Sequence, residues 1–273
     1  MIDITGLPIP EDAPTPGACI RIERPEPGLA VVVLDPPHRS LAVLDLALMR
    51  DLDAALDELE TSPDLRGVVF TGREPLSFAA GADIDAIEGI RDVELGARVI
   101  ALGQQIFGRI AKLGSRGVVT VAAVGGPVPG GAFELSLACK RIVLADDPKS
   151  RIGLPETKLG ILPGWGGSQR LPRRVGVPLA LDAILKGSLY PAKPALKKGL
   201  VDRLTPPEYL VRVASDIALG RRFCKHRERG VWEWLVDRNP LALFVIDRQV
   251  QKTVARQTRG HYPAATRAAK LVT

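Results

Sequence analysis

The sequence predicts an α/β fold with buried parallel strands, and two observations support this prediction. Short segments rich in β-branched residues alternate with longer segments whose apolar residues recur at helical spacing. One short segment, 118–124, contains only Val, Thr and Ala, the composition of a strand that is buried on both faces. It enters a loop rich in Gly and Pro, 125–131, and an apolar helix is expected to begin near Gly131. We expect this stretch to lie at the centre of the molecule.

The N-terminal part of the chain supplies the first strand, helix and strand of this alternation. Strands are expected at 18–23 and 29–34, joined by a turn, followed by an amphipathic helix over 44–59 and a strand over 66–71. The helix is expected to end before a Ser-Pro pair. The segment 1–17 contains four prolines and is expected to be a flexible leader.

The rest of the chain continues the alternation and then becomes helical. The remaining expected elements are a turn at 78–83 that leads into a helix, a long helix over 93–113, a short strand over 151–153, a glycine-rich loop over 163–167, short helices over 178–185 and 191–198, a strand over 201–204, and helices from 206 onward. We therefore divide the chain into the leader 1–17, a core over 18–205 that holds the active site, and a C-terminal helical region over 206–273.

Two glutamates are candidates for acid–base chemistry. Glu134 lies in the first turn of the expected apolar helix, where Phe133 and Leu135 flank it. A solvated glutamate that complements the helix dipole is the simpler interpretation, but a helix that is apolar on nearly all sides is expected to be buried. A buried carboxylate without a partner is costly, which favours a functional role. Glu156 follows a proline, as helix-start residues often do; near Glu134 it would form an acid–base pair.

The charge of the chain is concentrated at its C-terminal end. The chain carries 37 Lys and Arg against 31 Asp and Glu, a formal net charge of +6. Residues 221–273 hold twelve basic and four acidic residues, a net charge of +8, so residues 1–220 carry −2. Most of these basic residues are interpreted as a solvated helix surface. No basic run with interleaved aromatic residues indicates a nucleic-acid surface, so nucleic-acid binding is not expected.

Several function classes are excluded by missing motifs. The three histidines show no metal-ligand spacing, and neither a phosphate-binding loop, a dinucleotide fingerprint nor a nucleophile elbow occurs. We therefore expect no metal and no permanently bound cofactor. Three scattered cysteines predict no disulfide framework, and neither a signal peptide nor a membrane span is recognisable. The expected location is the cytoplasm.

Several ordered motifs resemble the crotonase (enoyl-CoA hydratase/isomerase) superfamily, and the chain looks most like the hydratase domain of the multifunctional fatty-acid oxidation α-subunit. The resemblance extends from about Ile20 to the C-terminus. The motifs that carry it are Phe78-Ala79-Ala80-Gly81-Ala82-Asp83-Ile84, Gly130-Gly131-Ala132-Phe133-Glu134-Leu135, Ile152-Gly153-Leu154-Pro155-Glu156, Leu159-Gly160-Ile161-Leu162-Pro163-Gly164, and Gly166-Gly167-Ser168-Gln169-Arg170-Leu171-Pro172-Arg173.

The resemblance implies a fold, a reaction and a site. The fold is a spiral of ββα units with a C-terminal helical region, and the reaction is the hydration of 2-enoyl-CoA thioesters in fatty-acid β-oxidation, with isomerisation of 3-enoyl-CoA as an additional activity. Glu134 and Glu156 would be catalytic, and the backbone N–H groups of Ala82 and Gly131 would form an oxyanion hole. The residues that the resemblance assigns to substrate and coenzyme A binding are Ala80, Ala82, Asp83, Ile84, Gly130 and Trp165.

The sequence also departs from the family pattern and leaves alternatives open. Ala42 stands where Asn is usual, Pro129 replaces a common Leu, and the bulky Trp165 is expected to shorten the acyl pocket. The alternatives are an isomerase without hydratase activity, or a crotonase-fold protein that binds RNA or a partner through its basic C-terminal region. The resemblance implies a homo-oligomer, either a trimer or a hexamer, or a thiolase partner if the chain is part of a multifunctional protein. Trp232 and Trp234 are expected to pack within the protein or at a subunit interface.

Overall fold

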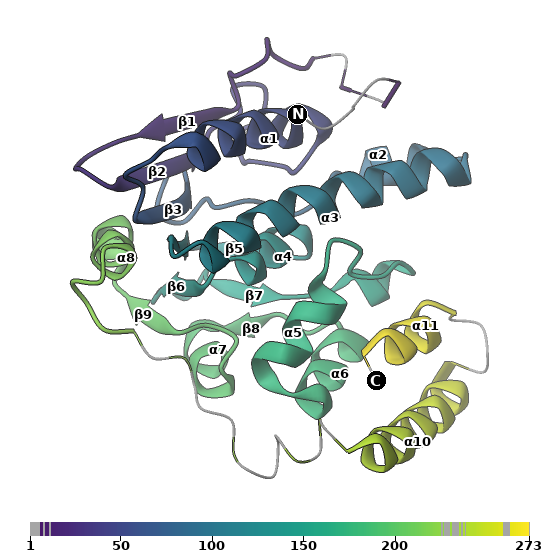
Figure 1. Cartoon of the computed structure of the whole chain (residues 1–273). Coiled ribbons are helices and arrows are strands. Elements are labelled where there is room, and N and C mark those ends of the chain that lie inside the picture. The colour runs from purple at the N-terminus through teal and green to yellow at the C-terminus, as the bar shows by residue number, and fades with distance from the viewer. Residues whose placement is uncertain are drawn as a thin grey trace.

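The structure is a computed structural model of the chain (Figure 1). It describes residues 6–272 except residues 8, 11, 225, 227–229, 231–234, 236, 238 and 259–262. Trp232 and Trp234, for which packing was predicted, lie outside the described residues, as do several residues of the predicted leader.

A six-stranded sheet forms the centre of the fold, in the order β1-β2-β3-β4-β6-β9. The first two strands pair antiparallel, and all the other neighbouring strands pair in parallel. The bounds of these strands are Ile20–Glu23 for β1, Leu29–Leu34 for β2, Gly67–Gly72 for β3, Val119–Val124 for β4, Arg141–Ala145 for β6 and Arg203–Thr205 for β9. Strands β2 and β3 are buried at every residue, as expected for parallel strands that are covered on both faces.

A second sheet is built from three short strands, β5 (Pro127–Pro129), β7 (Arg151–Gly153) and β8 (Tyr190–Pro191). The chain passes from the main sheet to this sheet and then into a helix twice, first through β4, β5 and α4, then through β6, β7 and the 3₁₀-helix η1. The helix α4 spans Gly131–Ala138 and η1 spans Glu156–Leu159. This progression confirms the predicted α/β spiral of ββα units.

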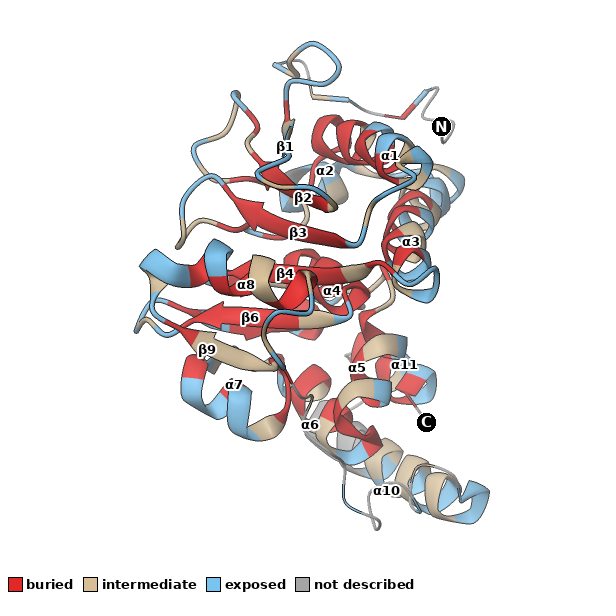
Figure 2. Cartoon of the chain, turned by 60° about the vertical axis from the view of Figure 1, so that its left-hand side comes forward, coloured by how far each residue is buried: buried red, intermediate tan, exposed pale blue. Residues whose placement is uncertain are grey.

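Helices cover both faces of the main sheet (Figure 2). On one face, α8 packs against alternate strand residues such as Val69, Val121 and Val143. On the other face, α1, α3 and α4 contribute to a larger core with Val68, Phe70 and the rest of the apolar interior. The bounds of the remaining helices are Leu46–Thr61 for α1, Ile84–Gly89 for α2, Val93–Ser115 for α3, Gly167–Val175 for α5, Val177–Lys186 for α6, Ala192–Lys198 for α7, Pro207–Tyr209 for the 3₁₀-helix η2, Leu210–Ala218 for α8, Pro240–Thr258 for α10 and Pro263–Val272 for α11.

Side-chain caps fix where several helices begin. Asp45 accepts a hydrogen bond from Leu48 N–H at the start of α1, and Asp92 accepts one from Glu94 N–H at the start of α3. The last helix, α11, lies beside α5 and α6 (Figure 1), and the Gln169 side chain of α5 donates to the Leu271 carbonyl. The predicted C-terminal helical region is therefore present in the described residues, and its end lies close to the core.

The structure differs from the sequence prediction in several elements. The segment 127–129, predicted as loop, forms the short strand β5, because pairing with β7 satisfies its backbone. Strand β6 and helix α5 were not predicted at all. The strand predicted over 201–204 begins at Arg203, because the turn after Gly199, which has φ = 79°, ends α7 with a hydrogen bond from Leu200 N–H to the Ala195 carbonyl. The division into leader, core and C-terminal region stays a prediction.

Candidate active site

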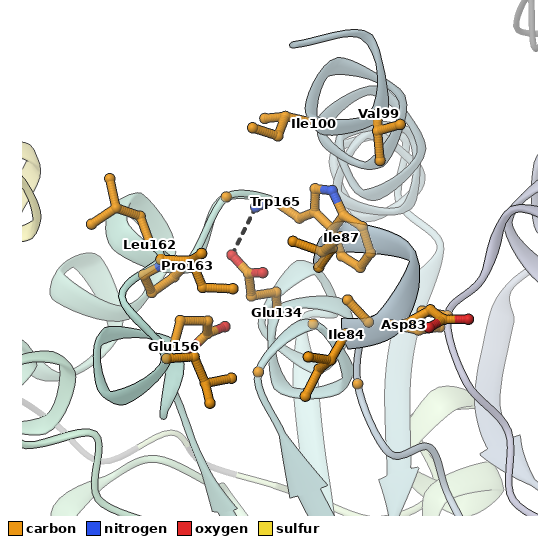
Figure 3. Close-up of a pocket in the computed structure, with 18 of the residues that line it drawn as sticks. Asp83, Ile84, Ile87, Val99, Ile100, Glu134, Glu156, Leu162, Pro163 and Trp165 are labelled. Atoms are coloured by element: carbon orange, nitrogen blue, oxygen red, sulfur yellow. Dashed lines mark hydrogen bonds between the residues drawn. The ribbon is translucent and has the colours of Figure 1, made fainter. Parts of the chain in front are cut away.

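A cavity of about 1000 Å³ lies beside the N-terminus of α4. Helices α2 and α3 form one wall and the loop around residues 159–165 forms the other (Figure 3). Residues of α11 also border the cavity. Every residue that the sequence predicted for the site lies along this cavity: Ala80, Ala82, Asp83, Ile84, Gly130, Gly131, Glu134, Glu156 and Trp165.

Glu134 lies in the first turn of α4 and borders the cavity. All eight residues of α4 are buried. Its side chain Oε1 accepts two backbone hydrogen bonds, from Trp165 N–H at 2.9 Å and from Gly167 N–H at 2.7 Å. A Cβ atom on Gly167 would lie 2.9 Å from this oxygen, so glycine lets the loop approach closely. Burial raises the pKa of Glu134 to about 7, although the two amide donors and the positive charge of Arg170 favour the ionised form.

Glu156 is the first residue of η1, and Leu154 and Pro155 connect it to the end of β7. It is 7% exposed, and neither carboxylate oxygen has a hydrogen-bond partner among the described residues. Burial raises its pKa to about 8, and the negative charge of Glu134 contributes to the same shift. Gly130, with φ = 54°, faces it: a Cβ atom there would lie 3.1 Å from Glu156 Oε1. The absence of a side chain at Gly130 therefore opens the space in front of Glu156.

The two glutamates thus differ in the form that their surroundings stabilise. Two amide donors favour the carboxylate form of Glu134, whereas no other residue in the described part of the chain donates a hydrogen bond to the Glu156 carboxylate. Both side chains point into the same cavity (Figure 3), and each negative charge opposes the ionisation of the other. The pair is suited to hold one proton near neutral pH, with the proton favoured on Glu156.

Two backbone amides lie close to this pair. Gly131 N–H belongs to the first turn of α4, where amides have no acceptor within the helix and the helix dipole favours negative charge. A parallel bridge between Leu44 and Ala82 holds the other loop. A Cβ atom on Gly81, which has φ = 101°, would lie 2.9 Å from the Pro129 carbonyl and 3.8 Å from the Gly131 nitrogen. The two loops predicted to supply amide donors are therefore in contact.

The residues predicted for coenzyme A line the same side of the cavity but differ in their contacts. Ala80 N–H donates to the Ala42 carbonyl at 2.8 Å, which ties the loop to the segment before α1. Asp83 caps α2 by accepting from Ala86 N–H at 3.1 Å, and it lies 3.6 Å from the Arg39 guanidinium. The Asp83 side chain is therefore engaged in capping α2 and in a charge contact with Arg39. The neighbouring Ile84 borders the cavity and is 47% exposed.

The Trp165 side chain occupies the inner end of the cavity. Its ring lies edge-on to Phe107, with centroids 5.6 Å apart. Cβ atoms on Gly131 and Gly103 would lie 2.6 Å and 2.3 Å from the nearest ring atoms. The indole is therefore packed between α3 and α4 in a space that two glycines provide, and it closes the cavity in that direction.

Gly103→Ala tests this packing. The added methyl group would collide with the Trp165 ring, so we expect a loss of about 1–3 kcal/mol in the free energy of unfolding, as for other overpacked cores. Urea denaturation measures the loss. Gly108→Ala on the same helix is the control, because nothing lies within 4 Å of the position of its Cβ atom. Equal stability of both variants would show that the ring is not confined there.

Sequence reasoning missed the apolar wall of the cavity and one cation. Ile87 of α2, Val99 and Ile100 of α3 and Leu162 of the facing loop line the cavity together with Ile84 and Trp165 (Figure 3). Each would pass for an ordinary amphipathic or loop residue, and only the tertiary fold brings them together. Arg170 also borders the cavity, and its place after a glycine-rich loop is the signal that could have identified it.

The raised pKa of Glu156 predicts how stability depends on pH. A carboxyl group whose pKa is raised by folding stabilises the protein below the ordinary value of 4.5, and this contribution is lost as pH rises through about 8. Glu156→Gln removes the titration. Its free energy of unfolding relative to the unsubstituted protein should therefore rise between pH 5 and pH 8 by on the order of 2 kcal/mol.

Chemical denaturation at pH 5 and at pH 8 measures this difference. Glu74→Gln, at an exposed position, serves as the control and should show no such change between the two pH values. A constant difference between Glu156→Gln and the unsubstituted protein would contradict a raised pKa at this site.

Two further properties concern metals and membranes. Within the described ranges, no three His, Cys, Asp or Glu side chains gather in a way that could hold a metal ion. None of the helices in the described part of the chain has both the length and the apolar character needed to cross a membrane.

Comparisons with known proteins relate the chain to one family. A family model described as enoyl-CoA hydratase/isomerase matches residues 24–226. The chain is 40% identical over 237 residues to the fatty acid oxidation complex subunit alpha of Aliivibrio fischeri, a match that covers 86% of this chain and 34% of that protein. The same subunit of Shewanella loihica is 36% identical over 244 residues, with 89% and 34% covered. The chain therefore spans about a third of the length of these relatives.

Solved structures show the same likeness. The enoyl-CoA hydratase of Bacillus anthracis superposes with a TM-score of 0.68 and 27% identity, and the match covers 90% of each chain. The human mitochondrial delta3-delta2-enoyl-CoA isomerase superposes with a TM-score of 0.65 and 25% identity, over 93% of this chain and 92% of that one. Both a hydratase and an isomerase are thus similar to this chain.

Proposed function

Because the chain belongs to the enoyl-CoA hydratase/isomerase family, we propose that it hydrates 2-enoyl-CoA thioesters in fatty-acid β-oxidation and also isomerises 3-enoyl-CoA to 2-enoyl-CoA. The observation that carries the proposal is the contrast between its two buried glutamates. Glu134 is held by two amide donors, and Glu156 faces the same cavity without any donor among the described residues. Such a pair supplies one base and one acid at neutral pH.

The thioester carbonyl would bind between the N–H groups of Ala82 and Gly131. When a nucleophile adds to C3, the electron pair of the double bond moves toward the carbonyl and leaves negative charge on its oxygen. Two fixed amides stabilise that charge, and losing one such donor typically costs on the order of 3 kcal/mol of barrier. The contact between the loops of Gly81 and Pro129 supports this placement.

A water molecule would add to C3 between the two carboxyl groups. Glu134, as the carboxylate, orients the water and accepts its proton while the oxygen bonds to C3. Glu156, as the acid, then delivers a proton to C2. The product contains one additional water, and the proton on the pair has moved from Glu156 to Glu134. Transfer of this proton back through the next bound water restores the starting state.

The same site supports isomerisation with Glu156 alone. In the form of the pair in which the proton lies on Glu134, the Glu156 carboxylate removes a proton from C2 of a 3-enoyl thioester, the oxyanion donors stabilise the dienolate, and Glu156 returns the proton at C4. An isomerase without hydratase activity is therefore the second candidate function. The likeness to the human isomerase favours it, and the presence of Glu134 with its two donors favours hydration.

The cavity suggests how the substrate lies. Backbone around Ala80, Ala82 and Ile84, together with Asp83 and Gly130, would border the coenzyme A portion and the thioester. The acyl chain would run along the apolar wall that Ile84, Ile87, Val99, Ile100, Leu162 and Trp165 provide. Trp165 closes the inner end, so a chain longer than a few carbons would leave along the open side between α2 and the loop at 159–162.

The C-terminal region offers a surface for assembly. Leu241, Phe244 and Val245 of α10 are 76%, 60% and 60% exposed. We propose that this surface forms a homo-oligomer, a trimer or a hexamer. In a longer multifunctional protein a thiolase subunit would be the partner instead. Light scattering of the purified chain with and without Phe244→Ser distinguishes these cases, because only self-association changes the mass.

One assay tests the reaction. The conjugated thioester of crotonyl-CoA loses its ultraviolet absorbance when water adds, so the purified chain should bleach it. A longer 2-enoyl-CoA measures the role of the apolar wall in the same experiment. Failure to bleach either substrate, in a protein that isomerises 3-hexenoyl-CoA, would replace hydration by the second candidate.

A further inference from the structure

We propose that Arg170 is a positioning residue for this site: it braces the loop that binds Glu134 and supplies the positive charge that keeps Glu134 the ionised member of the pair. This inference rests on the function proposed above and assigns a residue that acts through Glu134 and not on the substrate.

The Arg170 side chain binds the same loop that donates hydrogen bonds to Glu134. Its Nη1 donates to the Trp165 carbonyl at 2.7 Å. The same loop directs Trp165 N–H and Gly167 N–H toward Glu134 Oε1, at 2.9 Å and 2.7 Å. One short segment is thus held both by the guanidinium of Arg170 and by the carboxylate of Glu134. Without the guanidinium, the Trp165 carbonyl would lose this hydrogen bond. The loop would then hold the two N–H groups that donate to Glu134 less firmly.

Gly166 provides the space for this guanidinium. It has φ = 109°, a conformation that residues with side chains rarely adopt. A Cβ atom there would lie 2.0 Å from Arg170 Nη1 and 2.9 Å from its Cζ. The backbone conformation and the missing side chain are therefore both required for Arg170 to reach the Trp165 carbonyl.

Two arginines of α5, Arg170 and Arg174, differ in their charged partners. Arg174, one helical turn further on, donates to Asp202 at 2.6 Å, whereas Arg170 forms no ion pair among the described residues. Burial lowers the pKa of Arg170, and the negative charge of Glu134 opposes that shift. Arg170 in turn lowers the pKa of Glu134. The carboxylate whose charge is felt most strongly by this cation is therefore Glu134.

Other titratable groups around the pair do not replace this cation. Glu156 on η1 supplies no positive charge, and the negative charge of Glu134 contributes to the raised pKa of Glu156. Cys139, just after α4, is a buried thiol whose pKa is raised by burial, so it is neutral. Arg173 on α5 and Arg267 on α11 also border the cavity, but both are exposed to solvent, where their charges are screened. Repulsion from Arg173 lowers the pKa of Arg170. The ionised state of Glu134 is consequently expected to depend on Arg170.

The test compares three variants by the pH profile of kcat/KM for crotonyl-CoA hydration. Arg170→Gln removes the charge and should move the acid limb to higher pH by about one unit, since an adjacent opposite charge shifts a carboxyl pKa by about that much or more. Arg170→Lys retains the charge and should recover most of that shift. Arg173→Gln removes a charge from the same helix and should leave the limb in place.

Two outcomes would overturn the proposal. One is an Arg170→Gln variant that loses activity by the same factor at every pH, which would indicate a purely structural role. The other is an Arg173→Gln variant that shifts the limb as far as Arg170→Gln does. If Arg170→Gln does not fold, Arg170→Lys decides: an acid limb close to that of the unsubstituted protein supports the proposal, and a limb displaced by a full unit refutes it.

A second measurement separates this inference from the proposed function. Carbon-13 NMR of protein labelled at glutamate side chains, with Glu134→Gln for assignment, follows the titration of Glu134 without any turnover. A higher midpoint in Arg170→Gln than in the unsubstituted protein supports the role of Arg170 even in a chain that does not hydrate crotonyl-CoA. An unchanged midpoint refutes it even if hydration is confirmed.

Discussion

Glu134→Gln should reduce crotonyl-CoA hydration by about 10²–10⁴-fold, the usual contribution of a general base. The substitution retains the shape of the side chain and one oxygen that can accept from Trp165 N–H and Gly167 N–H. It removes the negative charge that would orient water and accept its proton. Because the amide can still fill the site, the loss should fall on kcat and leave the KM nearly unchanged. Loss of ultraviolet absorbance at saturating substrate measures the effect.

The isomerase assay is the internal control for this variant. Isomerisation of 3-hexenoyl-CoA requires one base and the oxyanion donors, so Glu134→Gln should retain a substantial part of it. If hydration continued near the original rate, Glu134 would not be the base. If both reactions were lost with the fold intact by circular dichroism, the two glutamates would have to act together in both reactions.

Glu156→Gln should abolish both reactions, and this is the second large effect that we expect. In hydration Glu156 delivers the proton to C2, and in isomerisation it moves the proton from C2 to C4. An amide can do neither. We expect a loss of at least about 10³-fold in each reaction, within the range of acid–base contributions. Parallel assays on crotonyl-CoA and 3-hexenoyl-CoA measure it.

The stability of Glu156→Gln provides the control for this loss. Because the buried carboxyl has no partner among the described residues, the variant should be as stable as the unsubstituted protein or more so at pH 8. A loss of activity in a protein that remains folded is then chemical and not structural. Retention of isomerase activity in this variant would identify another residue as the proton carrier and would reject the assignment of Glu156.

The elements of the fold were predictable where their local patterns were strong. The strand at 29–34 is a continuous apolar run and the helix ending before Ser62 shows clear apolar periodicity, and the structure has β2 and α1 at these places. Strand β6 was missed because it follows the buried helix α4 after only two residues, with Arg141 as its first residue. Helix α5 was missed because it contains Pro172 and begins in a glycine-rich loop. Tertiary contacts decide such segments, and local propensity does not.

The candidate site was predictable in its acids and only partly in its surroundings. Glu134 could be singled out because an apolar helix with one acid implies burial, and the structure places it at 2% exposure. Glu156 was recognisable only beside Glu134. The apolar wall from α2, α3 and the loop at Leu162 could not be predicted, because these segments meet only after folding. The two donors to Glu134 are backbone N–H groups, and the sequence does not show where a backbone N–H group will point.

The close packing of Trp165 against Gly103 and Gly131 means that the inner end of the cavity cannot be remodelled one residue at a time. A smaller side chain at 165 would leave a hole between α3 and α4, and a larger one at 103 would meet the ring. Alanine at 103 combined with a smaller residue at 165 would let the methyl group occupy part of the space that the Trp165 ring fills now. We therefore expect these positions to change as a set wherever related enzymes have exchanged one acyl preference for another.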